Sequence, residues 1–170
     1  MITFEIPPSL LDKAKLVSSK LNLQFSTPRI HAYGNAVPTL GELVVSEYLG
    51  VPITSTYQYD MELPDGRKLD VKTKFIRAAP RQDFNVAVSN VKRQDCDIYA
   101  FVFIKNDNTK AWLPGYLTST DFYAKAKHWK KGDTDRNLTF RQDCYTAFVH
   151  ELEPMEDLLK IVVDTRKTQA

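Results

Sequence analysis

The chain has 170 residues, 43% of them hydrophobic, which is typical of a single domain with one sizeable core. Its 23 lysines and arginines nearly balance its 21 aspartates and glutamates, giving a net charge of +2. The total charge therefore does not identify a nucleic-acid-binding protein, and any basic surface must be local. The two cysteines, Cys96 and Cys144, are too few for a disulfide framework and lack zinc-site spacing, so we expect buried, reduced thiols.

Residues 1–38 are expected to form an N-terminal helix and a loop. Apolar residues at helical spacing after Ser9 predict an amphipathic helix to about Leu21. The segment from Gln24 to Pro38 contains two prolines, a glycine and an asparagine and has no sustained period, so we expect a long loop there.

A second helix is predicted from a cap at Thr39 to about Leu49, ended by Gly50. It is apolar nearly all round, which indicates a buried position. Glu42 lies on its narrow polar strip, and Glu47 projects into its apolar arc. Each is a candidate for a buried functional carboxylate, and the alternative for each is an ordinary salt bridge.

Two alternating runs, Thr56 to Leu63 and Arg67 to Phe75, predict a β-hairpin around Pro64-Asp65-Gly66. The apolar rows of both strands face the same side if Met61 lies opposite Leu69. That register places Asp60 directly across from Asp70, with Cβ atoms roughly 5 Å apart.

Facing carboxylates repel unless a cation or a proton lies between them. Oxygen ligands without histidine or thiolate favour Mg²⁺ or Mn²⁺ over zinc. Lys72 projects from the same face as Asp70 and can orient an attacking water or stabilise negative charge on a phosphate. The alternative is a solvent-exposed charged face without catalytic function.

The remainder of the core, which spans residues 39–161, is predicted to mix strands and helices, an α/β (α+β) fold. The apolar run Asp97 to Ile104 predicts a buried strand, and Ser119 or Thr120 caps a helix to about Lys131. Further elements are expected as strands at Phe84 to Val88, Ala111 to Leu113 and Thr146 to Leu152, then a short helix from Pro154 to about Ile161 and a frayed tail over residues 165–170.

Basic residues are concentrated between Arg67 and Arg81, where Asp70 is the single acidic residue. Contact with phosphate is the functional interpretation, and Lys74 is the best candidate because it shares the polar face with Asp70. The other candidates are Lys68, Arg77 and Arg81; for the two arginines, merely keeping an exposed segment soluble is the alternative.

The order of Gly41-Glu42 in a helix, then Asp60, then Asp70-Val71-Lys72 in a hairpin, then the strand from Asp97, resembles the PD-(D/E)XK nuclease superfamily. Trp112-Leu113-Pro114-Gly115-Tyr116-Leu117, followed by Asp121-Phe122, is similar to small phage-encoded members. The resemblance covers roughly residues 40–159. The sequence departs from the family's name at Tyr59, which stands where that name has proline.

The resemblance implies a restriction-endonuclease-like core, in which helices flank a mixed sheet with the catalytic hairpin at its centre. It implies hydrolysis of phosphodiester bonds, with DNA as the substrate and endonuclease activity favoured. Asp60 and Asp70 would ligate Mg²⁺ or Mn²⁺, the carbonyl of Val71 would add a ligand, and Lys72 would position the water. Glu42 would complete the site directly or through water, and only the Gly-Glu match favours it over Glu47.

A rival interpretation is a noncatalytic nucleic-acid-binding or assembly module that retains this fold, and another is a plain protein-interaction domain. A homodimer is a possible arrangement for cutting both strands. The chain has no apolar run near the roughly 20 residues that span a bilayer, and its start lacks a signal-peptide pattern. We therefore expect no membrane contact and a cytoplasmic location, in the host cell if the protein is phage-encoded.

Overall fold

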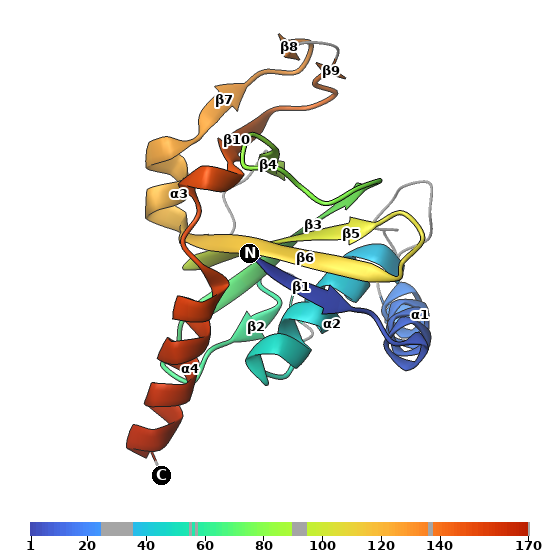
Figure 1. Cartoon of the computed structure of the whole chain (residues 1–170), viewed down its shortest axis with the longest axis vertical. Helices are drawn as coiled ribbons and strands as arrows, with labels where there is room; N and C mark the ends of the chain where they lie inside the picture. The colour runs from blue at the N-terminus through green and yellow to red at the C-terminus, as the bar shows by residue number, and fades with distance from the viewer. Residues whose placement is uncertain (25–35, 55, 57, 90–94, 136–137, 170) are drawn as a thin grey trace.

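The structure is a computed structural model that describes residues 1–24, 36–54, 56, 58–89, 95–135 and 138–169 (Figure 1). Its elements in chain order are β1 (Ile2–Glu5), α1 (Pro8–Gln24), α2 (Ala36–Leu49), β2 (Met61–Glu62), β3 (Lys68–Ile76), β4 (Asn85–Ser89), β5 (Ile98–Lys105), β6 (Lys110–Thr118), α3 (Ser119–Lys125), β7 (Lys127–Trp129), β8 (Thr134–Asp135), β9 (Leu138–Thr139), β10 (Cys144–Phe148), the 3-10 turn Val149–Glu151 and α4 (Met155–Gln169).

A mixed sheet of five strands organises the fold, in the order β1-β6-β5-β3-β2. β3 and β5 are parallel, and the other neighbours are antiparallel. β5 lies in the middle and is buried along Ile98 to Ile104, which confirms the predicted buried strand. β2 is an edge strand, so the expectation that the hairpin lies at the centre of the sheet is wrong.

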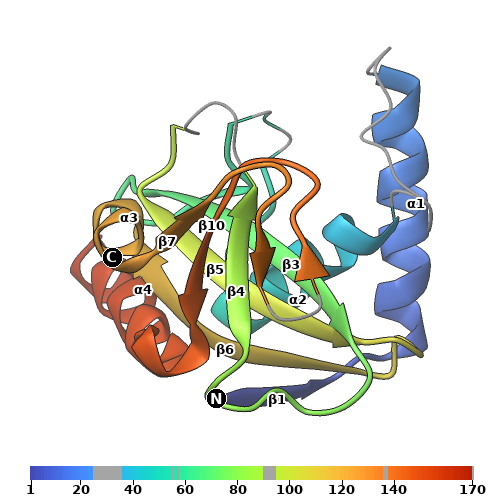
Figure 2. The ribbon, with the colours of Figure 1, turned by 90° about the horizontal axis from the view of Figure 1, so that it is seen from above.

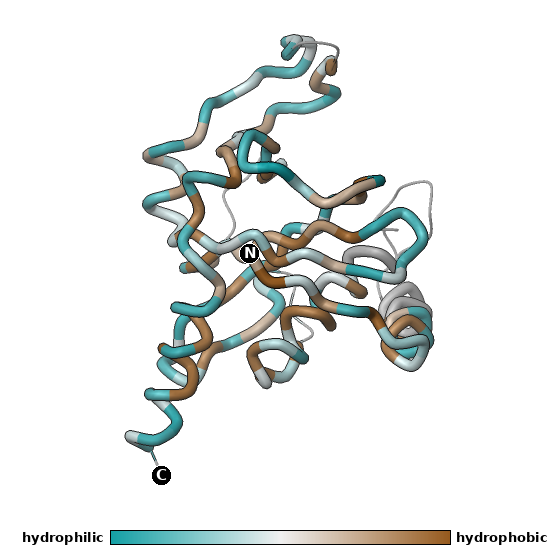
Figure 3. The backbone as a smooth tube through the Cα atoms, in the orientation of Figure 1, coloured by the Kyte–Doolittle hydropathy of each residue, from teal (hydrophilic) through white to brown (hydrophobic). Residues whose placement is uncertain are grey.

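The two faces of the sheet carry different partners. One face packs against α1, α2 and α4 around an aliphatic core that includes Leu69, Val71 and Leu43. The other face is covered by α3 and the smaller sheet β4-β10-β7 over an aromatic core (Figure 2). Hydropathy follows this layering, since the apolar residues gather on the central strands and inner helix faces, whereas the arm that carries β7, β8 and β9 is mostly hydrophilic (Figure 3). A mixed α+β fold is therefore confirmed.

Helix α2 approaches β3 very closely at one point. A Cβ added to Gly41 would overlap the Thr73 hydroxyl and lie 3.0 Å from the Thr73 Cβ. Glycine is required here because the helix backbone itself packs on the strand.

The helix begins at Ala36, so the predicted cap at Thr39 is wrong; Thr39 lies inside the helix and is buried. The helix ends as predicted before Gly50, which has a φ of 64°.

The expected helix to Lys131 is wrong, because α3 ends at Lys125 and Ala126 is extended. The following residues form β7, which pairs with β10. Trp129 explains the change, since its ring stacks on Phe140 at 4.7 Å and its indole N–H donates to the Thr146 hydroxyl at 2.8 Å. Strand pairing and this aromatic contact outweigh the local helical preference.

The C-terminal residues, predicted as a frayed tail, continue α4 to Gln169. Arg166 donates to the carbonyl of Gly50 at 2.6 Å, and Gln169 donates to that of Pro64 at 2.9 Å. These bonds attach the helix end to the turn after α2 and to the hairpin.

Most of the predicted loop from Gln24 to Pro38 lies outside the described residues. In the part of the chain that the structure describes, no helix has the length and apolar character needed to cross a bilayer.

The contact between α2 and β3 predicts an inverted effect for Gly41→Ala. In an open helix this change would stabilise by about 1 kcal/mol, whereas overpacking against Thr73 should cost about 1–3 kcal/mol. Chemical denaturation of Gly41→Ala, Thr73→Ala and the double variant would test this, and the cost should shrink when Thr73 is alanine. Stabilisation by Gly41→Ala in the native background would contradict the close approach.

Candidate functional site

The antiparallel pairing of the hairpin stops at Asp60. Met61 pairs with Leu69, as predicted, and Glu62 pairs with Lys68. The N–H of Asp60 then donates to the carbonyl of Leu69 at 2.9 Å, where a regular ladder would use the N–H of Met61. The predicted strand over Thr56 to Leu63 is therefore reduced to two residues within the described chain, and Asp60 does not form the expected strand pair with Asp70.

This one-residue slip moves Tyr59 across the sheet. Met61 packs in the aliphatic core, as predicted, whereas Tyr59 packs against the aromatic core on the other face. The ammonium of Lys68 lies 5.5 Å from the Tyr59 ring. Two successive residues opposite a single partner are the mark of a β-bulge, which re-aims the side chain that it carries.

The side chain re-aimed in this way is Asp60. Its Oδ2 accepts the backbone N–H of Val71 at 2.7 Å, a role that the carbonyl of Tyr59 would have in a regular ladder. Asp60 is only 8% exposed. Its carboxylate thus lies at the edge of β3, hydrogen-bonded to the peptide group that directly follows Asp70.

Asp70 and Lys72 lie on the charged face of β3, defined by Lys68, Asp70, Lys72 and Lys74. Asp70 is 4% exposed, and its Oδ2 lies 2.5 Å from the ammonium of Lys72. The same ammonium lies 5.7 Å from the ring of Tyr99 on β5. Burying a carboxylate is costly unless it is paired, so Lys72 provides the positive charge that this position needs.

The structure distinguishes the two glutamates of α2. Glu47 is about half exposed and lies 3.7 Å from the ammonium of Lys13 on α1, an ordinary salt bridge. Glu42 is buried, at 8% exposure, and directly follows Gly41, which packs on Thr73 next to Lys72. The resemblance-based preference for Glu42 thus agrees with its burial, although its role in the site stays a prediction.

The open edge of β3 offers oxygen atoms suited to a hard cation. Because a strand residue points its N–H and C=O to the same side, the carbonyl of Val71 faces the edge at which Asp60 binds the Val71 N–H. The carboxylates next to this peptide group are those of Asp60, which is hydrogen-bonded to it, and Asp70, which directly precedes it. Among the described residues, no three His, Cys, Asp or Glu side chains gather to hold a metal ion. The donor set fits Mg²⁺, which commonly takes one or two carboxylates and keeps several waters.

The basic candidates occupy different environments. Lys68 pairs with Asp95 at 2.7 Å, and Arg81 pairs with Asp83 at 2.9 Å, so both charges are partly neutralised on the exposed surface. Arg77 is exposed beyond the end of β3. Lys74 extends toward β4, where its ammonium donates to the Asn85 carbonyl at 3.1 Å.

Sequence reasoning missed the aromatic support beneath the charged face. Tyr99 and Tyr123 place their hydroxyl oxygens 3.2 Å apart, and burial raises the pKa of Tyr99. Burial also raises the pKa of the nearby Cys96 thiol to about 11, which makes it an inert, protonated thiol at neutral pH. Both cysteines are buried and free, as predicted.

The pair of Asp70 and Lys72 predicts an asymmetric effect on stability. Removing the ammonium by Lys72→Met should lower the free energy of unfolding in EDTA by about 1–3 kcal/mol, because the buried carboxylate loses its charged partner. Lys68→Met is the matched control, since it breaks an exposed pair on the same face and should leave the unfolding midpoint nearly unchanged. Equal effects of the two variants on the free energy of unfolding would show that the buried pair stabilises the protein no more than the exposed pair.

In comparisons with known proteins, no family model matches the chain, and no curated protein matches its sequence.

Proposed function

We propose that this protein is a metal-dependent nuclease that hydrolyses phosphodiester bonds of DNA. The observation that carries the proposal is the pair of buried carboxylates next to one peptide group of β3, with Lys72 beside Asp70. Asp60 and Asp70 are 8% and 4% exposed, and buried charged groups of this kind are retained chiefly where they are paired or hold a metal. The resemblance to the PD-(D/E)XK superfamily supports the same chemistry and the preference for DNA and for an endonuclease.

The proposed roles combine what the resemblance implies with the contacts of Asp60, Asp70 and Lys72. Asp60, Asp70 and the carbonyl of Val71 would hold Mg²⁺ or Mn²⁺, and Glu42 would contribute directly or through water. The bound ion would supply Lewis acidity and a lowered pKa of its water. Lys72 would turn from the Asp70 carboxylate toward the attacking water or the phosphate, where its charge stabilises the transition state.

A noncatalytic nucleic-acid-binding or assembly module is the second candidate. The observation in its favour is the short contact between Lys72 and Asp70, which satisfies the buried carboxylate without any ion. That module would bind DNA with the same affinity whether Asp70 is charged or neutral.

For the nuclease, a homodimer would suit cleavage of both strands of a duplex.

Cleavage assays with matched variants test the proposal. The wild type should cut DNA in Mg²⁺ or Mn²⁺ and not in EDTA, and Asp60→Asn, Asp70→Asn and Glu42→Gln should each lose activity about a hundredfold or more. Asp60→Asn keeps an oxygen acceptor for the Val71 N–H, so its loss of activity would report the charge and not the fold. Glu47→Gln is the matched control on the same helix and should retain full activity.

Linear, nicked, branched and single-stranded DNA should be compared in this assay, with RNA as a further substrate. Failure of the wild type to cut any of them in either metal, together with unchanged DNA binding by Asp70→Asn, would favour the binding module and end the catalytic proposal.

A further inference from the structure

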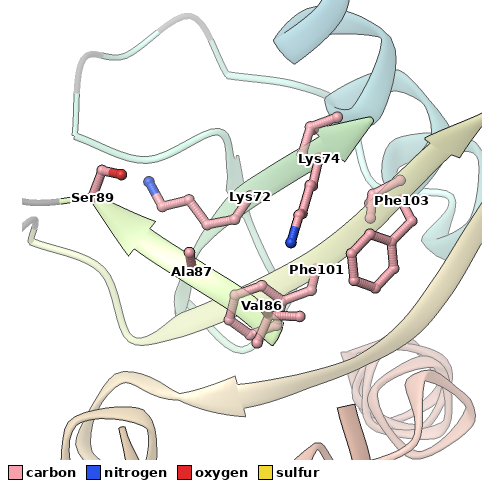
Figure 4. A pocket seen from close by; sticks show the side chains of 9 residues that line it. Lys72, Lys74, Val86, Ala87, Ser89, Phe101 and Phe103 are labelled. Carbon is pink, nitrogen blue, oxygen red and sulfur yellow. The ribbon is translucent and has the colours of Figure 1, made fainter. Parts of the chain in front are cut away.

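A pocket of about 170 Å³ lies between β3, β4 and β5, directly beside the proposed site (Figure 4). Lys72 and Lys74 extend into it from β3, Lys72 toward Ser89 and Lys74 toward the rings of Phe101 and Phe103. The wall opposite the lysines is formed by β4, including Ala87. The pocket therefore combines cationic groups, a hydroxyl and an aromatic surface.

Lys74 is the cation of this pocket that is available to an incoming anion. Its ammonium donates to the Asn85 carbonyl and lies 6.0 Å from the Phe103 ring. No carboxylate in the described ranges forms an ion pair with it. Although the residue is exposed overall, burial in the pocket lowers the pKa of its ammonium, and a bound anion would offset that cost.

The position of β4 limits what can reach the charged face of β3. The Lys74 ammonium is 3.1 Å from a β4 carbonyl, so the two strands are separated by the length of one lysine side chain. A double helix, whose major groove alone is about 12 Å wide, cannot enter a space of this size. The volume is several times the roughly 30 Å³ of a water, which suits one phosphate and part of one nucleotide.

Lys72 and Lys74 are two residues apart on one strand, so their Cα atoms are about 7 Å apart. This is of the order of the spacing between successive phosphates in a single strand. A strand with one phosphate at Lys72 would therefore bring its neighbour to Lys74, with the sugar or base against Phe101 and Phe103.

We propose that the pocket between β3 and β4 binds part of one nucleotide of a single strand, with one phosphate at Lys74 and the neighbouring phosphate near Lys72 and Ser89, so that the substrate is single-stranded DNA or an unpaired end. This inference rests on the proposed function, because it names the form of nucleic acid that the site accepts. It assigns β4 the role of a barrier that keeps a continuous duplex away from Asp70 and Lys72.

Binding in EDTA, where no metal-dependent cleavage occurs, tests the inference separately from catalysis. Fluorescence anisotropy would compare a labelled single-stranded oligonucleotide with a closed dumbbell duplex that has no free ends. The single strand should bind at least tenfold more tightly. Lys74→Met should weaken its binding about tenfold and reduce the salt dependence, log K against log[salt], by about 0.7 in slope.

Ala87→Phe should also weaken single-strand binding about tenfold, because the ring fills the pocket while Ala87 itself is exposed and tolerates the change. Lys125→Met is the matched control, since Lys125 is an exposed lysine that likewise donates to a backbone carbonyl, that of Glu151, at 3.2 Å. It should change neither the affinity nor the salt slope. Thermal melting of each variant verifies that it is folded.

Equal or tighter binding of the closed duplex, or single-strand binding unaffected by both Lys74→Met and Ala87→Phe, would overturn the inference. Cleavage of the closed duplex by wild type and Ala87→Phe at equal rates would also overturn it, although the nuclease proposal would stand. Pocket-dependent single-strand binding by a protein that cuts nothing would support the inference and refute the proposed function.

Discussion

The hydrogen bond between the Asp60 carboxylate and the Val71 N–H is the contact on which the site depends. It replaces one bond of the β2–β3 ladder, and so it ends β2 and leaves the edge of β3 beyond Leu69 without a paired strand among the described residues. It also holds Asp60 one peptide group away from Asp70. In a regular ladder, the carbonyl of Val71 would instead lie between paired strands.

Burial of charge follows from the same arrangement. Asp60 is held by a backbone donor, and Asp70 by the Lys72 ammonium, so the two carboxylates are stabilised by different partners although they lie close along the backbone. The tight packing of Gly41 on Thr73 brings α2 against the strand that carries Asp70 and Lys72. Two carboxylates buried close together repel each other, which lowers the stability of the fold. Such a cost is commonly kept where a site needs it for function, and a divalent cation bound here would relieve it.

Much of the fold and part of the site could be predicted from sequence alone. The register of Met61 opposite Leu69 followed from alternation and turn length, and the buried strand β5 followed from its apolar run. The slip at Asp60 could not be predicted, because Tyr59 continues the apolar alternation and its change of face depends on Lys68 and the aromatic core. Glu47 was misleading for a similar reason: its helical phase is apolar, but Lys13 of α1 pairs with it at the surface. The pocket beside Lys74 depends on β4, which no local pattern places over β3.

The central claim is that Asp60 and Asp70 together hold a divalent cation at the edge of β3. Electron paramagnetic resonance of Mn²⁺ titrated with the protein measures this directly, since bound Mn²⁺ loses the signal of the free aqueous ion. The account predicts saturable binding of Mn²⁺ by the wild type, competition by excess Mg²⁺, and loss of that binding in both Asp60→Asn and Asp70→Asn. Saturable binding that is unchanged in Asp70→Asn, or no saturable binding of Mn²⁺ by the wild type, would contradict it.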